Sequence, residues 1–152
     1  MSILRSTLLR SAVATGLLAV AVAGCAPIRP SQKIDIWEAT LVGAEEVPPV
    51  GTDGRGMAEV QFNTNTSVIS WKLTYSGLSG PATAAHIHGP AGVGQNAGVA
   101  VPFVNVAMQP VQGQATLTAA QVADLVAGRW YVNVHTPAHP GGEIRGQLRR
   151  RQ

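Results

Sequence analysis

The chain has 152 residues, of which 45% are hydrophobic and 12% are charged, and it contains a single cysteine. This length and composition suit one domain with a single core, and the lone cysteine excludes an intramolecular disulfide. The formal net charge is only +3, and Arg5 and Arg10 contribute to it from a segment that we expect to be removed. We therefore expect no nucleic-acid partner, since such proteins carry an extended basic surface.

Residues 1–24 resemble a bacterial lipoprotein signal peptide. Two arginines precede an uncharged apolar run, SAVATGLLAVAVAG, which is short for a membrane span and contains glycine. Small residues then precede Cys25 in the sequence VAGC. The resemblance implies that Cys25 is diacylated and anchors the protein in the cell envelope, in the outer membrane of a Gram-negative host because Ala26 follows. The alternative is an ordinary secretory signal with a chance cysteine.

The next segments predict a tether followed by β-structure. Residues 25–33 indicate a lipidated N-terminus and a proline-containing tether, and we expect the domain at residues 34–149 and a solvated basic end at 150–152. Residues 34–43 alternate in the manner of a strand, and residues 44–56 form a loop rich in proline and glycine. Residues 57–78 predict a β-hairpin, because two alternating runs flank the turn sequence NTNTS.

The second half predicts further strands and one helix. Residues 82–89 and 99–108 favour strands, the latter with Pro102 at an edge or bulge. Thr118 and Gln121 have the spacing of a capping box, before an apolar helix face of Val122, Leu125 and Val126 that ends at Gly128. Residues 129–136 and 142–150 favour the last strands. We expect an all-β fold, a Greek-key-like sandwich or barrel with one short helix.

All four histidines lie in two short segments. His86 and His88 alternate along one strand, so both side chains project from the same face of the sheet. Asn133 and His135 do the same on another strand, and His139 follows in a loop. If the strands are neighbours, three or four imidazoles can converge on one ion. Imidazole suits copper, zinc and nickel, and we favour copper over zinc because an exported protein can encounter it. The alternative is that the histidines only fasten the fold.

Several polar residues can support such a site. Asn133 shares a face with His135, and Glu143 and Arg145 alternate on one face of the last strand, where they can form an ion pair. That ion pair can orient a histidine, but we favour the simpler role of fixing the strand. Glu45 and Glu46 lie in the first loop, where adjacent glutamates are normally solvated.

Four segments, in order, resemble the CHRD domain of the animal protein chordin and of bacterial secreted proteins. These segments are LVGAEEVPPV, AAHIHGPAG, ATLTAAQVADLVAGRWYVNVHT and PGGEIRGQL, and the resemblance extends from about residue 34 to residue 148. It implies an extracytoplasmic β-rich domain. The polar residues that match the family motifs are His86, His88, His135, Glu143 and Arg145. The family commonly has asparagine where this chain has His139, which weakens that residue as a ligand.

The H-x-H pair is also similar to the copper-ligand pair of Cu,Zn superoxide dismutases, which are β-sandwich proteins. The chain lacks their bridging histidine, zinc-binding pattern and disulfide cysteines, so we do not expect dismutase activity. Three hypotheses remain. The first is a lipid-anchored protein that binds a transition metal, and the second is a cell-surface structural or protein-interaction module without metal. The third and least favoured is a metal-dependent redox or hydrolytic enzyme, and we assign no catalytic residue.

Overall fold

The computed structural model describes residues 33–152, so the expected signal peptide, Cys25 and most of the tether lie outside the described residues. These residues contain nine strands, one α-helix and one short 3-10 helix. In chain order the elements are β1 (Ile34–Val42), η1 (Gly43–Glu45), β2 (Arg55–Asn63), β3 (Val68–Ser76), β4 (Ala84–His88), β5 (Val99–Pro102), β6 (Val111–Thr116), α1 (Ala119–Val126), β7 (Tyr131–His135), β8 (Ile144–Gln147) and β9 (Arg149–Arg150).

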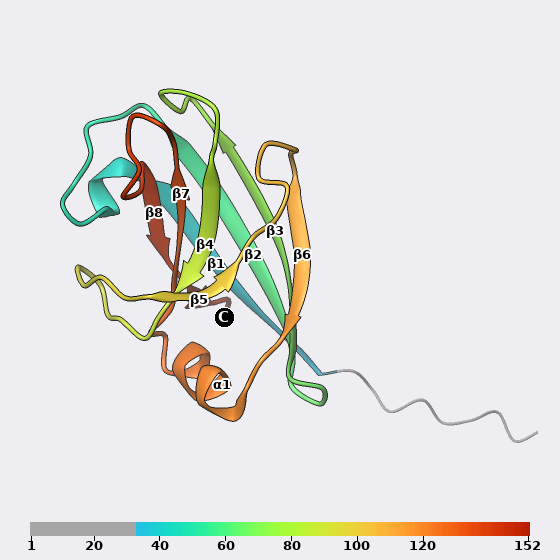
Figure 1. Cartoon of the computed structure of the whole chain (residues 1–152). Coiled ribbons are helices and arrows are strands. Elements are labelled where there is room, and N and C mark those ends of the chain that lie inside the picture. The colour runs from blue at the N-terminus through green and yellow to red at the C-terminus, as the bar shows by residue number, and fades with distance from the viewer. Residues whose placement is uncertain (1–32) are drawn as a thin grey trace, which may run out of the picture. The chain divides into compact units, whose positions relative to one another are not determined.

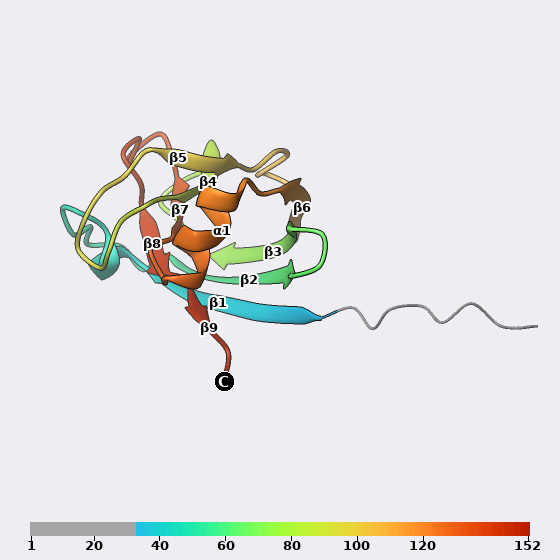
Figure 2. The ribbon, with the colours of Figure 1, turned by 90° about the horizontal axis from the view of Figure 1, so that it is seen from below.

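The strands form one antiparallel sheet that curls into a nearly closed barrel (Figures 1 and 2). The hydrogen-bonded order is β5-β4-β7-β8-β1-β2-β3-β6, and β9 pairs with β1. The curl of the sheet brings its two end strands, β5 and β6, towards each other, although they are not hydrogen-bonded. The order around the barrel is then β3, β6, β5, β4. Of these four strands, β6 comes last in the sequence and lies beside β3, which comes first, as in a Greek key. The predicted all-β fold with one short helix is confirmed.

The first three strands supply much of the core, because their side chains alternate between the inside and the outside of the barrel. Every second side chain of β1, β2 and β3 points into the barrel, while its neighbours point outward. Pairing of Trp37 with Val60 and of Val60 with Trp71 keeps the inward residues in register. The inward residues of these strands are Trp37, Ala39, Leu41, Ala58, Val60, Phe62, Ile69, Trp71 and Leu73.

β5 and β6 are the two end strands of the hydrogen-bonded sheet, and stacked aromatic rings fill the space between them. The rings of Trp71 and Phe103 lie parallel, with centroids 4.5 Å apart. Trp71 also lies directly beneath Gly113 of β6, where a side chain would overlap the indole ring. Glycine at position 113 thus allows β6 to lie close to the ring that packs against Phe103.

Helix α1 lies across one end of the barrel (Figure 2). The predicted capping box is present, because the Thr118 hydroxyl accepts a hydrogen bond from the Gln121 N–H and the Gln121 side chain accepts one from the Thr118 N–H. Leu125 is buried and Val122 packs against the core, but Val126 is 59% exposed. The prediction for Val126 is wrong, because the helix is only eight residues long and contacts the barrel through the Val122–Leu125 side.

The strands of the second half differ in several places from the sequence prediction. Strand β5 ends at Pro102, although a strand was expected over residues 99–108. Residues 111–116 form β6, which alternation does not reveal because the sequence VQGQAT is mostly polar.

The strand expected over residues 142–150 is divided into β8 and β9, and Arg149 and Arg150 of β9 pair with β1 while remaining exposed. Arg150 forms an ion pair with Asp35, and Arg151 forms ion pairs with two glutamates of β1 and β2, Glu38 and Glu59. The tail is exposed but held by acidic side chains.

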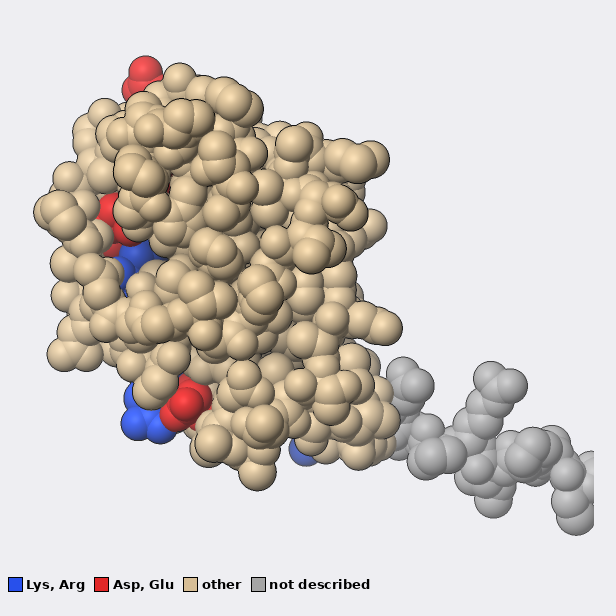
Figure 3. Space-filling view, in the orientation of Figure 1, with Lys and Arg blue, Asp and Glu red and all other residues tan. Residues whose placement is uncertain are grey.

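One face of the domain carries few charged side chains, and the described residues contain no membrane-spanning helix. The face shown in Figure 3 consists mostly of uncharged residues. No helix within residues 33–152 is both long enough and apolar enough to cross a bilayer.

We predict that Gly113→Ala will destabilise the domain by about 1–3 kcal/mol, because the added methyl group must displace Trp71 from its stack with Phe103. The free energy of unfolding from urea titration provides the measurement. Gly51→Ala is the matched control, since nothing lies within 4 Å of a Cβ at that position. Equal stability of the two variants would contradict the proposed packing.

Candidate metal site

The register of three neighbouring strands brings the polar residues together on the outer face of the barrel. β4, β7 and β8 pair so that His86 lies opposite Asn133, and Asn133 lies opposite Arg145. His88 lies opposite Tyr131 in the adjacent row. The intervening residues of β4 and β7 face the core, where they are buried: Ala85, Ile87, Val132 and Val134. Alternation predicted the shared face, and the pairing of β4 with β7 provides the convergence.

Three loops cover this outer face, so its polar side chains are largely removed from solvent. One loop contains Glu46, another contains Ala97, and the third connects β7 to β8 and contains Pro140 (Figure 1). His88 and His135 are buried beneath them, whereas His86 is half-buried. The site is therefore a covered patch on the outside of the sheet.

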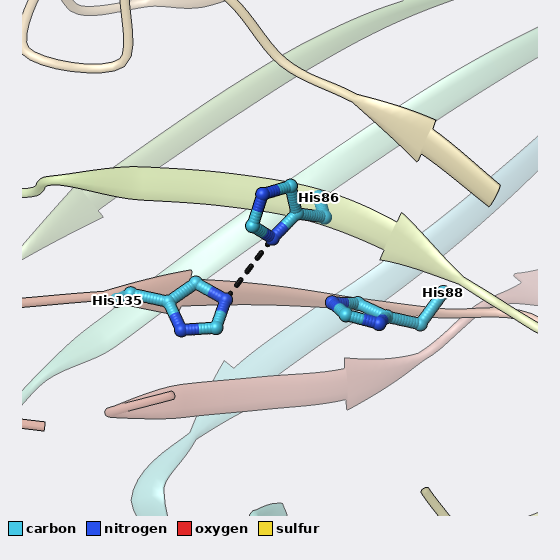
Figure 4. A group of neighbouring side chains, drawn as sticks. All are labelled: His86, His88 and His135. Atoms are coloured by element: carbon cyan, nitrogen blue, oxygen red, sulfur yellow. Dashed lines mark hydrogen bonds between the residues drawn. The ribbon is translucent and has the colours of Figure 1, made fainter. Parts of the chain in front are cut away.

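His86, His88 and His135 converge from β4 and β7 (Figure 4). Each offers one ring nitrogen, and these three nitrogens lie within 4.8 Å of one another. His86 Nδ1 is 3.1 Å from His135 Nε2. In a tetrahedral site with bonds of ~2.1 Å, nitrogens lie about 3.4 Å apart. The separation of up to 4.8 Å exceeds this spacing, so the rings must move closer together to bind one ion.

Backbone carbonyl groups orient two of the three rings. His88 Nδ1 donates to the Ala97 carbonyl at 3.0 Å, and His135 Nδ1 donates to the Pro140 carbonyl at 2.9 Å. A carbonyl oxygen can only accept, so each Nδ1 carries the proton and each neutral ring presents a bare Nε2. Such outer hydrogen bonds are typical of metal-binding histidines.

The two Nε2 atoms face an oxygen that cannot donate a hydrogen bond. Both lie 3.0 Å from Asn133 Oδ1, while the amide group of Asn133 also contacts Glu46. When the rings are neutral, His86 Nδ1 can donate to His135 Nε2, but no proton lies between either Nε2 atom and Asn133 Oδ1. A proton or a cation at the contacts with Asn133 Oδ1 would make this arrangement favourable.

The surroundings disfavour the proton. Burial lowers the pKa of His86, and the nearby His135 and His88 lower it further, whereas the Asn133 hydrogen bond opposes this effect. Burial also lowers the pKa of His135, with a further contribution from His88, and the Pro140 carbonyl opposes it. The neutral, metal-binding form of these two rings is therefore favoured at neutral pH.

Tyr131 and Arg145 form a stack behind His88. The rings of Tyr131 and His88 are parallel, with centroids 4.9 Å apart, and the Arg145 guanidinium lies 3.5 Å from the Tyr131 centroid on the ring face. Arg145 also donates to Asn96 Oδ1 and the Gln95 carbonyl, which holds the loop that contains Ala97. Tyr131 was not identified from the sequence, although it shares its face of the strand with Asn133 and His135.

Glu143 fixes the loops on the other side of His135. Its buried carboxylate accepts hydrogen bonds from the Thr52, Ser79 and Thr136 hydroxyls at 2.6–2.7 Å and from the Ser79 N–H at 2.8 Å. Burial raises the pKa of Glu143, but these hydrogen bonds outweigh it and hold the pKa at about 2. The expected ion pair with Arg145 is not formed, because hydroxyl groups satisfy Glu143 and loop oxygens satisfy Arg145.

The two remaining candidates occupy different positions. His139 does not belong to the three-histidine group; it lies at a surface hollow that Glu46 and Gly142 also line. Glu45 is exposed as expected, but Glu46 is only 5% exposed because the loop folds its side chain against Asn133. Burial raises the pKa of Glu46, and the charge of Arg145, the Val47 N–H and the Asn133 amide partly oppose this effect.

The model of the CHRD domain matches residues 37–148, which is most of the chain. The chain therefore belongs to the CHRD domain family, as its sequence motifs indicated. Searches of curated proteins and of solved structures find no match to the chain.

We predict that Glu143→Gln will destabilise the domain at pH 7 by about 1–3 kcal/mol, because the amide removes the charge and places donors against hydroxyl groups. The folded-state pKa of about 2 lies below the ordinary value of 4.5. The carboxylate therefore stabilises the fold fully above pH 4.5, and this contribution disappears as the pH falls towards 2. Urea unfolding at several pH values should show the difference from wild type shrinking over this interval.

The exposed neighbouring-loop variant Glu45→Gln serves as the control and should leave stability almost unchanged at pH 7. A Glu143→Gln deficit that stays constant from pH 7 to pH 2 would contradict the role of the charged carboxylate.

Proposed function

We propose that this CHRD-domain protein binds a transition-metal ion at His86, His88 and His135, with copper as the first candidate and zinc as the second. The observation that carries the proposal is the convergence of two bare Nε2 atoms and Asn133 Oδ1 without a donor between them. A metal cation accepts these lone pairs. The protein would thus hold a metal ion in the cell envelope rather than catalyse a reaction, and no catalytic group is assigned.

The choice of metal follows from the ligand chemistry. Three imidazoles and no carboxylate or thiolate make up the group within the described residues. Nitrogen ligands suit copper and zinc, whereas magnesium and calcium prefer oxygen ligands. The carbonyl groups of Ala97 and Pro140 keep Nδ1 of two rings protonated and leave Nε2 available.

The alternative function is a cell-surface structural or interaction module in which the histidines only fasten β4 to β7. The contact between His86 and His135 is compatible with such a role. The facing acceptors argue against it, because a purely structural network would gain from a donor at Asn133 Oδ1.

We predict that the purified full chain will bind one equivalent of copper or zinc and that His135→Ala will weaken the affinity at least a hundredfold. The control is His139→Ala, which removes a histidine outside the group and should leave the affinity unchanged. Every arm carries Cys25→Ser so that the thiol cannot bind metal. Competition with a chromophoric chelator gives the dissociation constants.

Affinity should persist below pH 6.5, the ordinary pKa of histidine, because burial lowers the pKa of His86 and His135, and should then fall as these rings become protonated. Wild-type protein that binds neither metal, or binds as well as a His86→Ala/His88→Ala variant, would favour the structural module.

We also propose that the protein is exported and anchored in the membrane through lipid on Cys25. The support is the signal-like sequence before the cysteine. A lipid anchor would keep the described domain, which has no membrane-spanning helix, at the membrane surface.

We predict that Cys25→Ser will abolish incorporation of labelled fatty acid and move the protein from the membrane fraction of bacterial cells to the soluble fraction. The control is Ser31→Ala, which changes the tether but not the acylation site. Membrane association that is unaffected by Cys25→Ser would refute the lipid anchor.

A further inference from the structure

The three-histidine site combines neutral ligands with a buried positive charge. The rings of His86, His88 and His135 are neutral when they bind a metal, so the ligands themselves cancel none of its charge. A bound Cu(II) ion would then carry two positive charges into a covered site, whereas Cu(I) would carry one.

The fixed positive charge belongs to Arg145. Its side chain is 2% exposed, and none of the four ion pairs among residues 33–152 includes it. A guanidinium does not lose its proton in proteins. Its hydrogen-bond and stacking partners are neutral: the Tyr131 ring, the Asn96 side chain and the Gln95 carbonyl. Its charge also acts on the carboxyl group of Glu46, but burial raises the pKa of that group and so disfavours the negative charge that would offset Arg145.

This charge lies close enough to influence the ion. The guanidinium carbon is 3.5 Å from the Tyr131 centroid, and that centroid is 4.9 Å from the His88 centroid. The separation from an ion on His88 Nε2 is therefore on the order of 10 Å. At an effective dielectric constant of ~20, repulsion over that distance weakens binding roughly tenfold for each additional positive charge on the ion.

The number of ligands acts in the same direction. The group within the described residues offers three imidazole nitrogens, one fewer than the corners of a square. Cu(II) prefers square-planar or tetragonal sites, whereas a d10 ion such as Cu(I) has no geometric preference from d electrons.

From these observations we infer that the site holds copper as Cu(I) in preference to Cu(II), with the buried Arg145 guanidinium as the residue that sets this preference. The inference rests on the proposed function, because it assumes that the three histidines bind copper. It adds the oxidation state of the ion and a role for Arg145 as a positioning charge that does not touch the metal.

The first test uses the full chain carrying Cys25→Ser and compares dissociation constants for Cu(I), Cu(II) and Zn(II). Cu(I) is measured anaerobically with ascorbate and bicinchoninate as the competing chelator, and the divalent ions are measured with chromophoric chelators at the same pH. We expect the constant for Cu(I) to be at least tenfold lower than those for Cu(II) and Zn(II). Copper-loaded protein should also remain silent in electron paramagnetic resonance.

The second test separates charge from structure at position 145. Arg145→Met removes the charge and should tighten Cu(II) relative to Cu(I) by about tenfold, whereas Arg145→Lys retains the charge and should keep the wild-type ratio. Both variants lose the guanidinium hydrogen bonds to Asn96 and Gln95, so a structural effect would appear in both.

The outcomes distinguish the two proposals. Wild-type protein that binds none of the three ions would refute the proposed function itself. Protein that binds Cu(II) or Zn(II) as tightly as Cu(I) would keep the metal site and overturn the preference for Cu(I). That wild-type comparison decides the matter even if Arg145→Met does not fold. An equal change of the ratio in both Arg145 variants would overturn the role of the charge.

Discussion

The antiparallel register between β4 and β7 is the constraint on which the site depends. Opposing residues on these strands place His86 against Asn133 and His88 against Tyr131, with His135 at the far end of the pair. The same register directs Ala85 and Val134 into the core. A slip of one residue would bury the imidazoles in the barrel and expose the apolar side chains, so the free energy of core burial also holds the histidines in place.

Loops then convert a polar patch into a covered site. Glu143 joins three loops through hydroxyl groups, and Arg145 holds the loop whose Ala97 carbonyl orients His88. These two buried charges do not pair with each other. Each stabilises separate backbone segments, so the orientation of the histidine rings depends on residues that never contact a bound ion.

Much of the fold could be predicted from local pattern. Alternating apolar residues identified the β2–β3 hairpin, and the spacing of Thr118 and Gln121 identified the helix start. The prediction failed where tertiary contacts override local signals. Strand β6 is mostly polar and is held by pairing with β3, and Val126 is exposed because the short helix contacts the barrel on only one side.

The sequence by itself determined the all-β class, the CHRD family and the face shared by His86 and His88, because alternation and motif order are properties of the chain. Only the tertiary structure decided that His135 joins them and that His139 does not. It also decided that Glu46 is buried and that Arg145 stacks on Tyr131 instead of pairing with Glu143. Strand neighbours and loop closure bring together residues far apart in the chain, and no local pattern records those distances.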